Sequence, residues 1–293
     1  MISMLANSYE ELQQSHPCFG GYKNSGRIHL PVSPGCNIGC RFCDRVINTE
    51  EDRPGVTSIV LKPEETREVI REALELCPDI KVAGIAGPGD TLATDYALET
   101  FRIVKENYPG LLKCMSTNGL MLYEKADDVI EVGVDSLTVT VNAVDPEIEA
   151  KLNKFIVYHG KRYEGVEAAK ILIENQLKGI RKVAEAGITI KVNTVLVPEI
   201  NGHHIEEIAK TVAESGAMIY NIIPLIPQHE LKDYKAPTCR EIDEARTKAG
   251  KYIDIFRHCQ HCRADAVGIP GKSEFGGQIY FRRVNIKETF SHG

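Results

Sequence analysis

The stretch Ser33-Pro-Gly-Cys-Asn-Ile-Gly-Cys-Arg-Phe-Cys-Asp44 places Cys36, Cys40 and Cys43 in a Cys-x3-Cys-x2-Cys spacing on one short loop. In a cubane iron–sulfur cluster, each of the four irons is usually held by one cysteine thiolate. These thiolates can reach three irons, and no further cysteine lies close by in the sequence for the last one. An iron with a free site can bind and activate a small molecule. The spacing therefore predicts a [4Fe-4S] cluster with a catalytic role.

The same triplet has a plainer interpretation, which is a zinc knuckle completed by a distant cysteine or histidine, because zinc also takes thiolates in fours. Zinc sites more often use paired Cys-x2-Cys arms, and this favours the cluster. The loop also follows a predicted strand, Arg27–Ser33. It is therefore expected at the carboxyl end of that strand, where α/β folds bind their ligands.

The composition excludes several classes of protein. The chain has 293 residues, a net charge of -6 and a pI near 5.9, whereas a nucleic-acid partner favours a basic face. No apolar run approaches the roughly 20 residues of a membrane span, and the N-terminus lacks the basic start and long apolar core of a signal peptide. We expect a cytoplasmic protein with neither a nucleic-acid nor a membrane partner. Its nine cysteines are then metal ligands or buried thiols rather than disulfides.

Short apolar runs alternate with amphipathic segments along the chain, which predicts an α/β fold. After Arg27–Ser33, the runs are Ile80–Ala86, Leu111–Ser116, Ser136–Val141, Ile188–Val197 and Met218–Pro224. Strands that alternate with helices indicate a parallel sheet with right-handed crossovers. We expect a partial parallel βα barrel of about six strands, two short of a complete barrel.

The chain is expected to divide into three segments. Residues 1–26 form an N-terminal extension, residues 27–225 form the partial barrel, and residues 226–293 form a C-terminal extension. Both extensions are expected to fold over the barrel mouth. Cys77 continues the apolar face of its helix and Cys239 begins a helix outside every motif, so both are expected to be structural.

A second group of cysteines is scattered along the chain. Cys259 and Cys262 form a Cys-x2-Cys pair more than 200 residues after the triplet. Two thiolates need at least one more ligand, and His16, Cys18 and Cys114 are the candidates. Iron–sulfur units and a structural zinc both remain open for this group on spacing alone.

The first cysteine triplet resembles the signature of the radical S-adenosylmethionine (SAM) enzymes. The resemblance implies that the open iron chelates the amino and carboxylate groups of SAM. It also implies that an electron from the cluster cleaves SAM to methionine and a 5'-deoxyadenosyl radical. The architecture of that family is a six-stranded open barrel, in agreement with the pattern of strands.

The same resemblance assigns SAM contacts to loops that follow the strands. The loop Gly87-Pro-Gly-Asp90 can hold the amino group of SAM, because its glycines allow close approach and Asp90 accepts hydrogen bonds from an ammonium. Ribose hydroxyls or the carboxylate of SAM are expected to contact Ser116, Thr117, Asn118, Thr140 and Asn142, with Asn193 and Asn221 as weaker candidates. The plainer interpretations are a turn, strand-forming threonines and hydrogen-bonded core amides.

The motifs together resemble the NifB family of nitrogenase cofactor biosynthesis enzymes. The matching pieces are His16-Pro-Cys18, the Cys36–Cys43 loop, Arg53-Pro-Gly-Val56, Gly84–Asp90, Ser116–Gly119 and Cys259–Gly268. The resemblance implies two further [4Fe-4S] units, K1 and K2, which are substrates. It implies a lyase-class carbide synthase that fuses these units into an 8Fe-9S-carbide precursor. One SAM donates a methyl group, and a second supplies the radical that abstracts hydrogen from it.

The NifB resemblance also assigns ligands and catalytic residues. It implies that the auxiliary units are held by His16, Cys18, Cys114, Cys259 and Cys262. Many family members carry another cysteine six residues after the triplet, where this chain has Thr49. A different ligand, such as Glu51 or a histidine, is then expected. Glu51 and Arg53 are candidate catalytic residues beside Cys36, Cys40 and Cys43.

Two other functions compete with the carbide synthase. One is a radical SAM enzyme of the molybdenum-cofactor type, although that family generally uses three C-terminal cysteines. The other is a non-enzymatic iron–sulfur scaffold with a structural zinc, which would not need SAM contacts. The expected partners of the synthase are SAM, an electron donor such as a ferredoxin, iron–sulfur donors and a carrier protein that accepts the product.

Overall fold

An eight-stranded sheet forms the centre of the protein, and six of its strands are the apolar runs that the sequence predicts. The computed structural model describes residues 9–20 and 24–283, so parts of both predicted extensions lie outside the described residues. The predicted strands are β1 (Gly26–His29), β5 (Ile80–Ile85), β6 (Leu112–Thr117), β7 (Ser136–Thr140), β10 (Thr189–Leu196) and β11 (Ile219–Pro224). They run parallel to one another, in the order β11-β10-β7-β6-β5-β1.

Two short strands extend the sheet beyond the predicted six. Strand β12 (Asp254–Ile255) pairs in parallel with β11, and β13 (Val267–Gly268) pairs antiparallel with β1. Each has only two residues, which is too short to show an alternating pattern. In the described part of the chain β12 and β13 do not pair with each other, so the sheet stays open there.

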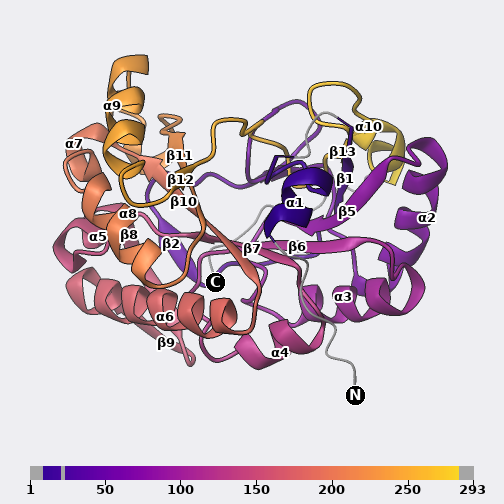
Figure 1. The fold of residues 1–293 in the computed structure, drawn as a ribbon, viewed down its shortest axis with the longest axis horizontal. Helices are drawn as coiled ribbons and strands as arrows, with labels where there is room; N and C mark the ends of the chain where they lie inside the picture. The colour runs from indigo at the N-terminus through magenta and orange to yellow at the C-terminus, as the bar shows by residue number, and fades with distance from the viewer. Residues whose placement is uncertain (1–8, 21–23, 284–293) are drawn as a thin grey trace.

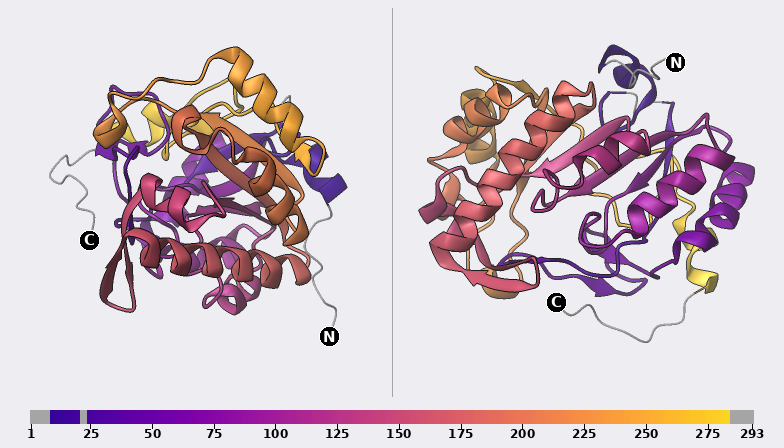
Figure 2. Two further views of the ribbon diagram at one scale, coloured as in Figure 1. Left: turned by 90° about the vertical axis from the view of Figure 1, so that its left-hand side faces the viewer. Right: turned by 90° about the horizontal axis from the view of Figure 1, so that it is seen from below.

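Helices cover the outer face of the curved sheet (Figure 1, Figure 2). The longer ones are α2 (Thr66–Leu76), α3 (Tyr96–Asn107), α6 (Gly165–Glu185), α8 (Ile205–Glu214) and α9 (Cys239–Ala249). The short ones are α4 (Ala126–Glu131), α5 (Pro146–Leu152), α7 (Pro198–Asn201) and α10 (Gly276–Ile279). Helix α1 (Tyr9–Ser15) does not belong to this layer, because its Leu12 packs against Ile219 on the inner side of the sheet. Cys77 lies buried in the core at the end of α2, whereas Cys239 is exposed at the start of α9. Among residues 9–20 and 24–283 no helix is long and apolar enough to cross a membrane.

The two faces of the sheet differ in character. Side chains such as Leu137, Val139, Ile190 and Val192 belong to the apolar core. The alternate positions form polar rows across the strands, because residues paired in register point to the same face. Thr140 pairs with Asn193, which in turn pairs with Asn221. The inner face of the sheet is therefore polar.

The chain crosses the open side of the sheet after β12. Residues 256–266 lead from β12 to β13 (Figure 1). These two strands are the edges of the sheet, where β12 pairs with β11 and β13 pairs with β1. Phe256 from this crossing packs with Leu12 and Phe19 of the N-terminal segment against Ile219, the first residue of β11. Both terminal segments thus reach the inner side of the sheet.

The cysteine loop has a small sheet of its own. Strand β2 (Ile38–Cys40) pairs with β8 (Asn153–Tyr158), which pairs with β9 (Lys161–Glu164). Cys40 lies opposite Asn153 in this ladder. After the loop, β3 (Val46–Ile47) pairs with β4 (Val56–Thr57). These backbone hydrogen bonds hold the loop in one shape.

Candidate functional site

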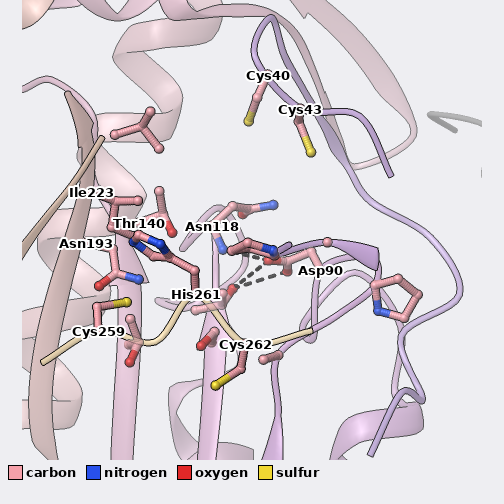
Figure 3. Close-up of a pocket in the computed structure, with 18 of the residues that line it drawn as sticks. Cys40, Cys43, Asp90, Asn118, Thr140, Asn193, Ile223, Cys259, His261 and Cys262 are labelled. Carbon is pink, nitrogen blue, oxygen red and sulfur yellow. Dashed lines mark hydrogen bonds between the residues drawn. The ribbon is translucent and has the colours of Figure 1, made fainter. Parts of the chain in front are cut away.

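A cavity of about 340 Å³ lies on the inner face of the sheet. This volume is within the range of small-molecule sites, roughly 300–1,000 Å³. Its wall includes Cys40 and Cys43 from the first cysteine group and Cys18, Cys114, Cys259 and Cys262 from the second. In the view of Figure 3, Asp90 and Asn118 lie between Cys40 and Cys43 on one side and Cys259 and Cys262 on the other. One cavity therefore joins both cysteine groups.

The first cysteine group is buried around a guanidinium. Cys36 and Cys40 are each 7% exposed, and Cys43 is half-buried. Burial raises the pKa of the Cys36 and Cys40 thiols, most strongly for Cys40. All three thiols act electrostatically on Arg45, whose Nη1 is buried and makes no hydrogen bond to the described residues. Burial thus favours the neutral thiols, whereas the nearby Arg45 and any bound cation favour the thiolates.

The donor chemistry of this loop fits an iron–sulfur cluster. Thiolates are the soft ligands that hold such clusters, and each binds a separate iron. Asn118 directs its Nδ2 towards Cys36 Sγ at 3.8 Å and donates to Asn37 Oδ1 at 2.7 Å. Within residues 9–20 and 24–283, no three His, Cys, Asp or Glu side chains are arranged for a single metal ion.

Gly89 holds the loop after β5 against the cysteine loop. Its N–H donates to the Ser33 carbonyl at 2.8 Å, and the Asp90 N–H donates to the Gly35 carbonyl at 2.8 Å. A Cβ on Gly89 would lie 2.0 Å from the Gly35 oxygen, so no larger residue fits without moving one of the loops. Gly87 has φ +128, in the region that favours glycine. Gly89 therefore docks one loop on the other, whereas Gly87 provides a backbone conformation that favours glycine.

The Asp90 carboxylate organises the end of β6. It accepts hydrogen bonds from the backbone N–H of Asn118 at 2.6 Å, from the Leu92 N–H at 3.0 Å and from the Thr117 hydroxyl at 3.0 Å (Figure 3). Burial raises the pKa of this carboxyl, and the three kinds of donor oppose that effect. Asp90 is 4% exposed and lines the cavity. Asp90 therefore faces the cavity, and its lone pairs are already largely used by the protein.

The other predicted SAM contacts line the same cavity, with the exception of Asn221. They are Ser116, Thr117, Asn118, Thr140, Asn142 and Asn193. Some of their polar atoms bond within the protein: Asn142 Oδ1 accepts from the Val195 N–H at 3.0 Å, and Asn193 Oδ1 accepts from Asn221 Nδ2 at 3.1 Å. The structure thus brings these side chains together along the carboxyl ends of β6, β7 and β10.

Gln176 on α6 is a cavity residue that motif analysis misses. Its Nε2 donates to the Asn118 carbonyl at 2.7 Å and to the Thr140 carbonyl at 2.9 Å. These bonds tie together the ends of β6 and β7 and fix the orientation of the amide. The Oε1 atom is buried without a partner in the described residues. A single glutamine on the buried face of a helix shows no spacing that would distinguish it from a core amide.

The second cysteine group converges from three remote segments. Cys18, Cys114, Cys259 and Cys262 all line the cavity. Burial, followed by the neighbouring Cys18, raises the pKa of Cys114 to about 12. Burial acts in the same direction on Cys259, but contacts with His261 outweigh it and lower the pKa of this thiol to about 7. Four soft donors around one space are the ligand chemistry of an iron–sulfur unit, and among the described residues they are not arranged around a single metal ion such as zinc.

Two histidines lie beside this group. His16 is 1% exposed; its Nδ1 accepts from the Cys18 N–H at 3.0 Å, and its Nε2 has no partner among the described residues. His29, which motif analysis misses, lines the cavity from β1. Its Nδ1 donates to the Arg263 carbonyl at 2.9 Å, so Nε2 carries a lone pair. Burial, then the nearby Arg27, lowers the pKa of His29 to about 4, which keeps the imidazole neutral near pH 7.

Glu51 and Arg53 lie outside the cavity wall. Arg53 Nε donates to Glu51 Oε2 at 2.7 Å, and Arg53 Nη1 donates to the Asp44 carbonyl at 2.6 Å. Glu51 also accepts from Asn48 Nδ2 at 2.8 Å, and Thr49 is exposed. In this arrangement the Glu51 carboxylate is held by Arg53 and Asn48 rather than directed towards the cysteines.

Glu149 on α5 is a buried acid close to the cysteine loop. It is 1% exposed, its Oε1 accepts from Asn153 Nδ2, and its Oε2 has no partner among residues 9–20 and 24–283. Burial raises the pKa of this carboxyl from 4.5 to about 7. Asn153 pairs with Cys40 in the β2–β8 ladder, so this acid lies behind the first cysteine group.

We expect Glu149 to make the stability of the protein depend on pH. With its pKa raised, the folded state keeps a proton that the unfolded chain releases. This stabilisation is complete below about pH 4.5 and is lost as the pH rises through about 7. The side chain of Gln does not titrate. When the pH rises from 5 to 8, the free energy of unfolding of Glu149→Gln should therefore increase by up to about 3 kcal/mol relative to that of the wild type. Denaturant unfolding at both pH values measures this difference.

The exposed Glu147 on the same helix provides the control. Glu147→Gln should follow the wild type at both pH values. An equal effect of pH on the wild type and on Glu149→Gln would contradict the assignment of a buried, protonated acid.

Comparisons with known proteins agree with this geometry. Residues 30–212 match the family model of the Radical SAM superfamily. Over 287 residues the chain is 48% identical to the FeMo cofactor biosynthesis protein NifB of Methanocaldococcus infernus, covering 97% of this chain and 94% of that protein. It is 46% identical over 295 residues to NifB of Methanocaldococcus jannaschii, covering 98% of each.

A solved structure shares the fold. The crystal structure of Streptococcus suis SuiB bound to S-adenosylmethionine matches with a TM-score of 0.56 and 14% identity. The match covers 85% of this chain and 55% of the SuiB chain. At this identity the likeness concerns the arrangement of helices and strands alone.

Proposed function

The chain belongs to the radical SAM superfamily and, within it, to the NifB family, and from this premise we propose that it is the carbide synthase of nitrogenase cofactor biosynthesis. In this proposal the enzyme fuses two [4Fe-4S] substrate units, which supply eight irons and eight sulfides, takes the ninth sulfur from a separate sulfur donor, and inserts a carbon from SAM to form the 8Fe-9S-carbide precursor. The observation that carries the proposal is the single cavity that joins the two cysteine groups. A radical generated at one group can then reach a substrate held at the other.

The first cysteine group is proposed to hold the SAM cluster. When bound by Cys36, Cys40 and Cys43, this cluster supplies the electron that cleaves SAM reductively. Arg45 provides a positive charge beside the three thiolates. Asp90 fixes the backbone of Asn118 and the hydroxyl of Thr117, and so presents the end of β6 to SAM. Burial of these groups excludes water, which strengthens their electrostatic effect on SAM.

The second cysteine group is proposed to hold the substrate units K1 and K2. Cys18, Cys114, Cys259 and Cys262 are the proposed thiolate ligands. His16 accepts from the Cys18 N–H at Nδ1, so its buried Nε2 carries the ring proton, and His16 can bind iron through Nε2 only in the other tautomer. Fewer than four permanent ligands per unit would leave both units able to rearrange and depart.

His29 is the proposed iron ligand in place of the cysteine that many family members carry at the position of Thr49. A metal-binding histidine usually donates its other ring N–H to a carbonyl or carboxylate, and His29 donates to the Arg263 carbonyl. Its neutral Nε2 is a suitable iron ligand. We propose His29 in preference to Glu51, because the Glu51 carboxylate is held by Arg53 and Asn48.

Iron counting together with SAM cleavage tests the proposed function. A cubane contains four irons, so the carbide synthase predicts about twelve irons per chain, and an enzyme of the molybdenum-cofactor type predicts about eight. A scaffold predicts about four irons with one zinc. About twelve irons with active SAM cleavage supports the synthase, and either of the other counts contradicts it.

The proposal also includes a ferredoxin-like electron donor, iron–sulfur donors, a carrier for the product and a cytoplasmic location.

We expect Asp90→Ala to weaken SAM binding by roughly tenfold or more, because a charge-assisted hydrogen bond is worth about 1.5–3 kcal/mol. Equilibrium binding of SAM to the cluster-loaded protein measures this loss. Asp90→Asn separates two roles of the carboxylate. If Asp90 mainly positions Asn118 and Thr117, the amide should retain much of the affinity. If its charge faces the ammonium of SAM, Asn should lose as much as Ala. An unchanged dissociation constant in Asp90→Ala would remove this residue from the SAM site.

A further inference from the structure

Lys191 interrupts the apolar pattern of β10 with a buried charge. It is 6% exposed, and it pairs in register with Thr138 of β7 and Ile219 of β11. Its neighbours Ile190 and Val192 belong to the apolar core, whereas Lys191 lines the cavity. A lysine is rarely this buried unless an anion accompanies it. The position of Lys191 therefore needs an explanation that strand formation does not provide.

The ammonium of Lys191 has no carboxylate partner in the described part of the chain. Its one hydrogen bond goes to the Cys18 carbonyl at 3.5 Å. The rings of Phe19 and Phe256 each lie 5.1 Å from Nζ, one from each terminal segment. Lys113 on β6 is a useful contrast, because it is also buried but lies 3.8 Å from the Asp135 carboxylate.

These contacts compensate only partly for the loss of water around the charge. A cation–π contact with a phenylalanine ring is weaker than the hydration that an unpaired buried ammonium loses. The remaining cost indicates that the functional protein holds an anion near Lys191. The candidate anions are the thiolates of the second cysteine group, since the charge of Lys191 acts on Cys114.

From this arrangement we infer that Lys191 is the counter-charge of the iron–sulfur unit that the second cysteine group holds. The inference rests on the proposed function, which places such a unit there. Thiolates and sulfides make a bound cluster anionic, and one added electron increases its negative charge. A fixed ammonium nearby stabilises the more negative state. Lys191 therefore raises the reduction potential of the unit at Cys18 and Cys114, while Phe19 and Phe256 hold the ammonium in place.

The test compares Lys191→Met with Lys191→Arg in the protein loaded with iron and sulfide. Methionine keeps the length of the side chain without its charge, and arginine keeps the charge and can stack on both phenylalanines. Reduction potentials come from redox titration with an electrode, followed by electron paramagnetic resonance. We expect Lys191→Met to shift the equilibrium for one-electron reduction of the auxiliary unit at least tenfold towards the oxidised form, about 59 mV. Lys191→Arg should stay close to wild type.

Lys182→Met is the control, because it removes a lysine on α6 that pairs with Asp127 at 2.8 Å and does not line the cavity. It should leave the potential of the auxiliary unit unchanged, and neither Lys191 variant should alter the SAM cluster. If Lys191→Met fails to assemble the auxiliary unit, retention of that unit in Lys191→Arg supports the counter-charge, and its loss in both variants contradicts it.

Two results would overturn the inference in distinguishable ways. If the wild type holds auxiliary units and Lys191→Met has an unchanged potential, the inference fails while the proposed function stands. If the wild type binds only about four irons, the count for one cubane, then the proposed function fails and the counter-charge with it.

Discussion

Replacing Cys40 with alanine is expected to abolish reductive cleavage of SAM. Cys40 is one of three thiols on the loop proposed to hold the SAM cluster, and β2 holds it in register with Asn153. Two remaining thiolates would leave two irons of a cubane without protein ligands. Anaerobic incubation with dithionite and SAM, followed by chromatography of 5'-deoxyadenosine, measures this loss.

The Cys40→Ala protein should keep substantial iron, because the second cysteine group does not depend on this loop. Cys239→Ala is the control, since Cys239 is exposed at the start of α9 and belongs to no motif. That variant should form 5'-deoxyadenosine at the wild-type rate. Undiminished formation of 5'-deoxyadenosine by Cys40→Ala would overturn the assignment of the SAM cluster to this loop.

Replacing both Cys259 and Cys262 with alanine is expected to abolish carbon transfer into a cluster. These residues lie on the crossing between the two edges of the sheet, and both line the cavity. Burial raises the pKa of Cys262 although Arg27 donates to its Sγ at 3.4 Å, whereas contacts with His261 outweigh burial and lower the pKa of Cys259 to about 7. Without these two thiols the proposed substrate units lose two ligands, while the SAM cluster should keep its spectrum.

Methyl-labelled SAM distinguishes this chemistry from other radical SAM reactions. The wild type should retain the carbon of the label in its product cluster, and the double variant should retain none. Cys77→Ala controls for the general loss of a thiol, because Cys77 is a buried cysteine on the outer side of the sheet. If the wild type has full iron loading and active SAM cleavage but transfers no carbon, the carbide-synthase proposal is wrong. The enzyme of the molybdenum-cofactor type would then be the better interpretation.

Local patterns in the sequence were sufficient to predict most of the fold. The six strands lie where the apolar runs predict them, because the apolar pattern of a buried strand is visible in the strand's own consecutive residues. The cysteine triplet also lies where a ligand site was predicted, since Cys40 and Cys43 line one side of the cavity. The short strands β12 and β13 were not foreseen, since pairing with the sheet edges, and not their own residues, makes them strands.

For the loop Gly87-Pro-Gly-Asp90, sequence patterns predicted the location but not the reason for Gly89. Its position after a strand predicted that it lines the site, and the structure agrees for Pro88, Gly89 and Asp90. The reason for Gly89 is different from the predicted one. It is the close approach to Gly35 that excludes a side chain, and a contact between two loops leaves no periodic trace in either.

The composition of the cavity was decided only by the tertiary structure. Cys18, Cys114 and the Cys259 crossing come from segments far apart in the sequence, and only the path of the chain across the open sheet brings them together. The surroundings of Lys191 and Gln176 are of the same kind. Each is an ordinary residue in its own strand or helix, and its neighbours come from other elements. Secondary structure depends on neighbours in sequence and can be predicted from them, whereas burial and electrostatic environment depend on neighbours in space.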